Sequence, residues 1–140
     1  MNSDFVIDTY AWVEYFAGSD AGRKVRSFVE GQNCATPTIV VAELSRKLLK
    51  EIRHSRETEE GRLQKLTFVG SSSDVTALNG DLATKAGELD VERRLLVKDW
   101  GLADSIVLAT ARECGARVVT GDRHFRDLKD EVIFVPASRA

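Results

Sequence analysis

The sequence has no apolar run that approaches a membrane span. A membrane helix needs roughly 20 consecutive apolar residues, and charged or polar side chains interrupt every apolar stretch of this chain well before that. The first residues, MNSDFVID, have neither a basic segment nor a long apolar core, so we expect no secretory signal peptide. We therefore expect a cytoplasmic protein with no membrane partner.

Cysteine and histidine, which often do chemistry in proteins, are scarce. Cys34 and Cys114 are isolated, with no CxxC pair and no spacing typical of a zinc site. We interpret them as free thiols in a reducing compartment, with a disulfide as the alternative. His54 and His124 fall on different predicted elements. We interpret both as surface or packing residues, because a catalytic pair would have to converge.

The chain also lacks a large excess of either charge, with 20 basic and 22 acidic residues and a formal net charge of −2. A nucleic-acid partner therefore cannot be inferred from bulk charge, and would need a local basic patch or a bound metal. Only 2 prolines and no low-complexity tract interrupt the 140 residues. We expect a single domain, residues 1–140, with a sizeable core.

Short apolar strand patterns alternate with helical patterns along the chain. The strand patterns lie near 4–7, 33–36, 74–77, 117–120 and 132–135. Helical patterns occupy about 9–17, 20–31, 38–54, 56–69, 79–95 and 102–115, with a short turn near 123–127. Strands joined through helices form a mostly parallel sheet covered on both faces. The predicted fold is therefore α/β, a three-layer α/β/α sandwich.

Two of the predicted strands are followed by an aspartate. Asp8 directly follows the apolar residues 5–7, and Asp122 follows RVVTG. In open α/β sheets, ligands bind beyond the carboxyl ends of the strands, near a topological switch point. Asp104 lies in a nearly apolar helical pattern, where a charge needs a reason. Glu43 lies on the polar stripe of another predicted helix.

Each of these acids also has a purely structural interpretation. Asp8, Asp104 and Asp122 are good N-cap residues, a role worth about 1 kcal/mol each. Glu43 can pair with Lys47 one turn later. For each acid taken alone, we prefer the structural interpretation. Taken together, three of the acids are expected at one edge of the predicted sheet. Clustered carboxylates need cations, and hard oxygen ligands suit Mg²⁺ or Mn²⁺ rather than zinc.

In order and spacing, the four acids resemble the acidic quartet of PIN-domain ribonucleases, and most closely the VapC-type toxins of prokaryotic toxin–antitoxin pairs. The specific segments are DTYAWVEYF and ADSIVLATARECGARVVTGDRHF, and the resemblance covers essentially the whole chain. It implies a Mg²⁺- or Mn²⁺-dependent endoribonuclease that leaves a 5′-phosphate and a 3′-hydroxyl. Asp8, Asp104 and Asp122 would be the metal ligands, and Glu43 would orient the attacking water or complete a second metal site.

The resemblance also implies supporting residues and partners. Thr9, Ser105 and Thr120 match positions where the family often has hydroxyls, so they are candidates to orient the acids. An RNA substrate, a cognate antitoxin protein and a homodimer are implied as well. Lys47 and Lys50, on the basic face of the same predicted helix as Glu43, are candidate RNA contacts.

Three other functions are considered. A receiver-type phosphotransfer domain would have an aspartate after the third strand and a lysine after the last, where this chain has VTALNG and PASRA. A PIN-like module that binds RNA or a protein without cleavage would be favoured by the loss of an acid, and all four are present. A DNA nuclease of the same superfamily typically has long additional helical regions, for which 140 residues leave little room.

Overall fold

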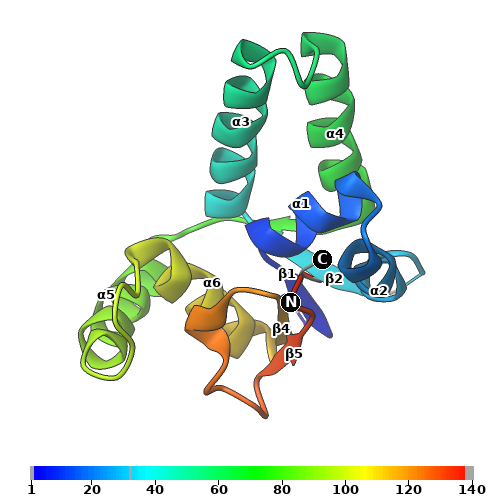
Figure 1. The fold of residues 1–140 in the computed structure, drawn as a ribbon. Coiled ribbons are helices and arrows are strands. Elements are labelled where there is room, and N and C mark those ends of the chain that lie inside the picture. The colour runs from blue at the N-terminus through cyan, green and yellow to red at the C-terminus, as the bar shows by residue number, and fades with distance from the viewer. Residues whose placement is uncertain (1, 32, 138–140) are drawn as a thin grey trace.

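The computed structural model describes residues 2–31 and 33–137. Its strands form one five-stranded sheet in the order β3-β2-β1-β4-β5 (Figure 1). They are β1 (Phe5–Ile7), β2 (Cys34–Pro37), β3 (Asp74–Thr76), β4 (Arg117–Thr120) and β5 (Val132–Phe134). All five predicted strands are present. Every pairing is parallel, where the sequence pattern predicted a mostly parallel sheet.

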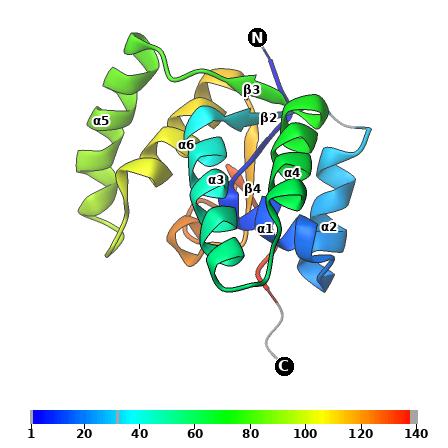
Figure 2. The ribbon, with the colours of Figure 1, turned by 90° about the horizontal axis from the view of Figure 1, so that it is seen from above.

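Helices fill the connections, as the sequence pattern predicted. They are α1 (Thr9–Ala17), α2 (Asp20–Val29), α3 (Thr38–Arg53), α4 (Glu59–Ser72), α5 (Gly80–Arg94) and α6 (Leu102–Cys114), with a 3-10 turn, η1 (Arg123–Phe125). Crossover connections between parallel strands are right-handed, so this strand order puts α1 to α4 on one face of the sheet and α5 and α6 on the other. The fold is the predicted α/β/α arrangement, and the α3–α4 hairpin extends away from the sheet (Figures 1 and 2).

The core forms where α1 packs near the central strands. Trp12 is fully buried. Its indole N–H donates a hydrogen bond to Thr36 Oγ1 at 3.1 Å, which satisfies the polar atom of a buried ring. Phe16 stacks on Trp12 with ring centroids 5.6 Å apart. These contacts fix the helix that begins directly after Asp8.

The strand order reverses between β1 and β4, which are neighbours in the sheet. From β1 the chain leads toward β2 on one side, whereas from β4 it leads toward β5 on the other. A crevice forms beyond the carboxyl ends of strands at such a point. Asp8 follows β1 directly and Asp122 lies two residues after β4. The topology therefore sends both aspartates to the same crevice.

Cys34 and Cys114 are free and buried, in agreement with the preferred interpretation. Within residues 2–31 and 33–137, no helix has both the length and the apolar character needed to cross a membrane.

Candidate active site

A cleft of about 430 Å³ opens beyond the carboxyl ends of the central strands. It is lined by residues of α1, α3, α6 and η1, and by the aspartates that precede α1 and η1. All four predicted acids are in the lining: Asp8, Glu43, Asp104 and Asp122. Lys47 lines the cleft as well, whereas Lys50 is exposed and lies outside the lining.

Asp8 both caps a helix and faces the cleft. Its Oδ1 accepts a hydrogen bond from the Ala11 N–H at 2.9 Å, which caps α1. The residue is only 6% exposed. Burial raises the pKa of Asp8 to about 7; the Thr120 hydroxyl and the Ala11 N–H oppose the shift, and the Asp122 and Asp104 carboxylates add to it. A nearby cation would favour the ionised form of this carboxyl group.

Asp104 lies in the first turn of α6. The helix begins at Leu102, so Asp104 is not the N-cap residue itself and caps the helix by reaching back. Its Oδ2 accepts a hydrogen bond from the Gly101 N–H at 3.0 Å. Burial raises the pKa of Asp104, while the hydrogen bonds from Gly101 and His124 act in the opposite direction.

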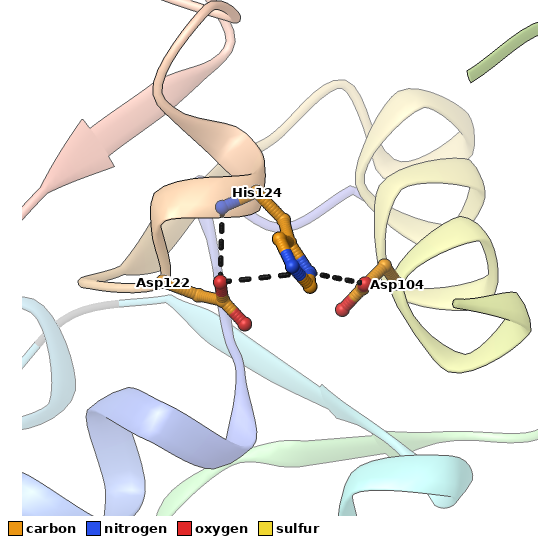
Figure 3. Close-up of side chains that lie close together, drawn as sticks. All are labelled: Asp104, Asp122 and His124. Atoms are coloured by element: carbon orange, nitrogen blue, oxygen red, sulfur yellow. Dashed lines mark hydrogen bonds and ion pairs between the residues drawn. The ribbon is translucent and has the colours of Figure 1, made fainter. Parts of the chain in front are cut away.

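His124 joins Asp104 and Asp122 in a compact group (Figure 3). Asp122 caps η1 by accepting the His124 N–H on its Oδ1 at 2.9 Å. The His124 Nδ1 lies 3.1 Å from Asp104 Oδ2 and 3.6 Å from Asp122 Oδ1. The interpretation of His124 as a surface or packing residue did not anticipate these contacts with Asp104 and Asp122. The available signal was its position two residues after a strand-end aspartate.

A divalent cation fits these donor atoms. In an octahedral shell with bonds of about 2.1 Å, neighbouring ligand atoms are about 3.0 Å apart. The 3.1 Å separation of His124 Nδ1 from Asp104 Oδ2 is close to that edge length, and the 3.6 Å separation from Asp122 Oδ1 is longer. One ligand atom from each of Asp104, Asp122 and His124 lies within 4.8 Å of the others. Carboxylate oxygens suit Mg²⁺ or Mn²⁺, and an imidazole nitrogen shifts the preference toward a transition-metal ion.

Glu43 reaches the cleft from α3 on the other side. The Thr9 Oγ1 donates a hydrogen bond to Glu43 Oε1 at 2.6 Å, so the first residue of α1 orients a carboxylate of α3. Among the described residues, Glu43 makes no ion pair with Lys47. The structural alternative for Glu43 therefore has no support in its contacts.

Comparison with known proteins agrees with this geometry. The family model of the PIN domain matches residues 5–131. The chain belongs to the PIN-domain family. This membership excludes the receiver-type phosphotransfer domain. No curated protein sequence matches the chain.

Solved structures share the fold of this PIN domain. A toxin–antitoxin complex from Klebsiella pneumoniae matches with a TM-score of 0.73 and 18% identity, over 96% of this chain and 100% of that one. VapBC2 from Rickettsia felis, bound to a promoter DNA fragment, matches with a TM-score of 0.71 and 19% identity, over 96% of this chain and 98% of that one. Mycobacterium tuberculosis VapC20, a sarcin–ricin loop cleaving toxin, matches with a TM-score of 0.70 and 17% identity, over 89% of this chain and 95% of that one.

Two of the predicted hydroxyl residues of the PIN domain have different neighbours. The Thr120 Oγ1 accepts a hydrogen bond from the Asp122 N–H at 2.9 Å, at the cleft. The Ser105 Oγ instead accepts from Trp100 Nε1 at 2.7 Å and donates to Asp90 Oδ1 at 2.9 Å. Ser105 therefore supports the scaffold behind the cleft, and none of its hydrogen bonds among the described residues goes to the four acids.

The glycine between Thr120 and Asp122 permits a close approach of the chain. A Cβ at Gly121 would collide with the Tyr10 ring and with the Val135 carbonyl oxygen. Glycine is therefore needed for β4 to end against α1, and this packing places Asp122 at the cleft.

Glu14 is a fifth acid in the lining of the cleft, and sequence analysis missed it. It lies on α1, one turn after Tyr10 and beside Val13, which also line the cleft. Residues three and four apart share one face of a helix, but Tyr10 was not predicted at the site, so this spacing gave no signal. The Glu14 Oε1 accepts a hydrogen bond from Ser19 Oγ at 2.9 Å, which ties the carboxylate to the start of α2.

Proposed function

We propose that this PIN domain is a divalent-metal-dependent endoribonuclease of the cytoplasm and the toxin of a toxin–antitoxin pair. Membership in a family of nucleases supports hydrolysis of phosphodiester bonds. The observation that supports the proposal most is the convergence of four acids from separate elements on one cleft. Carboxylates at close range repel one another, so their convergence favours cation-assisted chemistry over a module that only binds.

The residues of the cleft have distinct roles in this proposal. Asp8, Asp104 and Asp122 would hold Mg²⁺ or Mn²⁺, with His124 beside them. When bound, such an ion stabilises charge on a phosphate and lowers the pKa of water. Glu43, fixed by Thr9, would accept a proton from the attacking water. These roles predict products with a 5′-phosphate and a 3′-hydroxyl.

Lys47 has a separate role in the proposal. It is exposed and lines the same cleft as the four acids. Its ammonium group would contact a phosphate of the RNA backbone, which brings a positive charge to an otherwise acidic cleft.

Cleavage of a labelled RNA, with and without EDTA, tests this proposal. We expect EDTA to stop cleavage, added Mn²⁺ or Mg²⁺ to restore it, and the products to end in a 5′-phosphate and a 3′-hydroxyl. Cleavage that persists in EDTA, or products ending in a 2′,3′-cyclic phosphate, would contradict the mechanism.

An apolar groove beside the cleft supports the proposed antitoxin partner. The groove measures about 290 Å³ and shares Val13 and Lys47 with the cleft. Phe16, Leu44 and Leu48 provide apolar walls from α1 and α3, and charged residues line the rest of the groove: Glu51, Arg56, Glu57 and Lys65. An amphipathic helix in this groove would direct an Arg or Lys side chain toward the carboxylates, where it replaces the metal cation.

Competition with Mg²⁺ tests this form of inhibition. At matched ionic strength, raising Mg²⁺ is expected to weaken binding of the proposed antitoxin. Inhibitor affinity that is indifferent both to Mg²⁺ and to Asp104→Asn would place the partner elsewhere.

Exposed apolar side chains support the proposed homodimer. Val91 and Leu95 are 67% and 83% exposed near the end of α5, and Leu96 and Leu102 are 74% and 52% exposed before and at the start of α6. A second copy would remove them from water. We expect a dimer mass by light scattering and a monomer for the double variant Leu95→Glu, Leu96→Glu; a monomeric wild type would contradict the proposal.

A further inference from the structure

The turn η1 brings two residues to the cluster but is itself short. It spans Arg123–Phe125, follows Asp122 and contains His124. By contrast, Asp104 and Glu43 lie on helices of 13 and 16 residues. Three residues of 3-10 helix have poor hydrogen-bond geometry and little rigidity of their own. The positions of Asp122 and His124 therefore depend on contacts from outside the turn.

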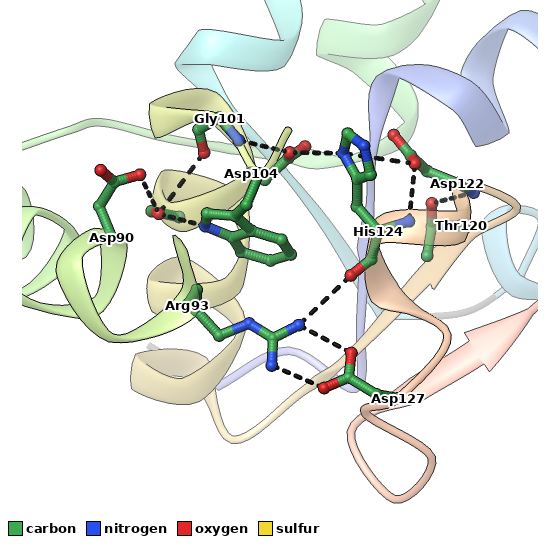
Figure 4. A network of polar contacts seen from close by, with 10 residues as sticks. Asp90, Arg93, Gly101, Asp104, Thr120, Asp122, His124 and Asp127 are labelled. Carbon is green, nitrogen blue, oxygen red and sulfur yellow. Dashed lines mark hydrogen bonds and ion pairs between the residues drawn. The ribbon is translucent and has the colours of Figure 1, made fainter. Parts of the chain in front are cut away.

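Arg93, at the end of α5, makes these contacts (Figure 4). Its Nη1 donates to Asp127 Oδ2 and its Nη2 to Asp127 Oδ1, both at 2.8 Å. The same Nη2 donates to the backbone carbonyl oxygen of His124 at 3.3 Å. The guanidinium thus holds the turn at His124 and just beyond its end. A planar guanidinium with two parallel hydrogen bonds fixes orientation as well as distance.

The burial of Arg93 is not explained by stability alone. The residue is only 4% exposed, and its guanidinium carbon lies 4.4 Å from the centroid of the Trp100 ring. Its Nε is buried and has no hydrogen-bond partner among the described residues. A buried ion pair is often no more stabilising than well-packed apolar residues of similar volume. We therefore infer the role of Arg93 from its charge and its two parallel hydrogen bonds to Asp127, and not from its burial.

Trp100 extends this frame to the helix that holds Asp104. Its indole N–H donates to Ser105 Oγ on α6 at 2.7 Å. Its ring packs against Phe125 of η1, with centroids 5.0 Å apart. The same group of side chains therefore connects α5, α6 and η1, which together set the spacing of Asp104 from His124.

We propose that Arg93 is a positioning residue of the metal site. It holds η1 so that Asp122 and His124 stay within coordination distance of Asp104, and it contacts neither the ion nor RNA. This inference rests on the proposed metal-dependent function. Groups that orient metal ligands typically change metal affinity by about 10- to 100-fold when removed.

A second Arg–carboxylate pair provides the matched control. Arg112, on α6, donates to Glu131 from Nε at 2.7 Å and from Nη2 at 3.1 Å. The pair is also bidentate, but it lies where β5 begins, away from the carboxyl edge, and its side chains are 47% and 36% exposed. Its loss removes the same type of interaction without touching the turn η1.

Mn²⁺ binding to metal-free protein, measured by electron paramagnetic resonance, tests the inference. We expect the dissociation constant to rise about tenfold or more in Arg93→Met and less than about twofold in Arg112→Met. Asp127→Asn is the second variant, because its side chain is 50% exposed and its loss is tolerated more easily. We expect it to weaken Mn²⁺ binding too, and to add little in combination with Arg93→Met.

Histidine ring signals in NMR spectra give a second readout. The chain has only two histidines, and His54, exposed at the end of α3, serves as the internal reference. Arg93→Met should shift the His124 signals and leave those of His54 in place, and Arg93→Lys should recover part of the Mn²⁺ affinity. Wild-type affinity and unmoved His124 signals in both Arg93→Met and Asp127→Asn would overturn the inference alone. A wild type that does not bind Mn²⁺ would overturn the proposed function with it.

Discussion

Strand β1 has an aspartate on each side, and the pair shows how position in a parallel sheet changes one side chain. Asp4 precedes the strand and is exposed, whereas Asp8 follows it and is 6% exposed. The Asp4 backbone extends the sheet, with its N–H donating to the Asn33 carbonyl oxygen at 2.8 Å. Asp8 instead meets a cleft shared with other carboxylates, and burial raises its pKa to about 7.

The difference arises from burial at the carboxyl edge, which outweighs the opposing effect of the capping bond on the pKa of Asp8. Asp8, Asp104 and Asp122 each accept a backbone hydrogen bond at the start of a helix or turn. The positive end of the helix dipole favours a carboxylate there. Capping and metal binding are therefore compatible roles. In Asp8 and Asp122, the capping bond uses Oδ1, so Oδ2 makes no capping bond.

The largest predicted effect is on cleavage. Asp8→Asn should reduce the rate of RNA cleavage by more than about 100-fold, since it removes a direct metal ligand, while Asp4→Asn should stay within about twofold. Asparagine caps a helix about as well as aspartate, so α1 should remain folded in both variants. Rates with a defined RNA and circular dichroism spectra check this. If Asp8→Asn cleaves RNA at the wild-type rate, Asp8 acts only as a helix cap.

The second predicted effect is on stability in the absence of metal. Because the pKa of Asp8 is about 7 in the folded protein and near 3.8 when unfolded, the folded state binds more protons between these values. The contribution of Asp8 to stability is therefore largest at low pH and falls as pH rises from about 4 to about 7. Asp8→Asn should raise the free energy of unfolding at pH 8 by at most about 4 kcal/mol.

Urea denaturation in EDTA measures that effect. The gain from Asp8→Asn should vanish near pH 4, and Asp4→Asn should show no such pH dependence. An equal gain at pH 4 and pH 8 would mean that ionisation of Asp8 is not its cause.

The third predicted effect is on metal affinity. A metal ion and a proton compete for the same carboxylates, and burial raises the pKa of both Asp8 and Asp104. Mn²⁺ affinity should therefore weaken by about tenfold between pH 8 and pH 6. Calorimetry at several pH values measures this, and an affinity that does not change over this range would contradict the assignment of Asp8 as a ligand.

The smallest predicted effect separates two lysines of α3. Lys47 lines the cleft and Lys50 does not. In the Asp8→Asn background, where RNA stays intact, Lys47→Ala should lower the slope of log affinity against log salt by about one. Lys50→Ala should leave the slope unchanged, and equal slopes for the two variants would remove Lys47 from the RNA contact.

The convergence of Asp8 and Asp122 could be predicted because the local sequence shows both the aspartates that follow two strands and the alternation of strands with helices. His124 was missed because a three-residue turn has no periodicity from which to read a face, and its only signal was its position two residues after Asp122. Arg93 was missed although a signal existed. It falls on the buried stripe of α5 with Leu82, Ala86 and Leu89, a charge at an apolar position. Its partner Asp127 lies 34 residues away, and no local pattern predicts that contact.

The most direct test is whether the cleft that contains Asp8, Asp104 and Asp122 binds a divalent ion. Mn²⁺ titrations at pH 8, followed by electron paramagnetic resonance, should be run on wild type, Asp4→Asn and Asp8→Asn. The account predicts the same saturable binding in wild type and Asp4→Asn, and loss of that binding in Asp8→Asn. Equal Mn²⁺ binding in all three proteins would contradict it.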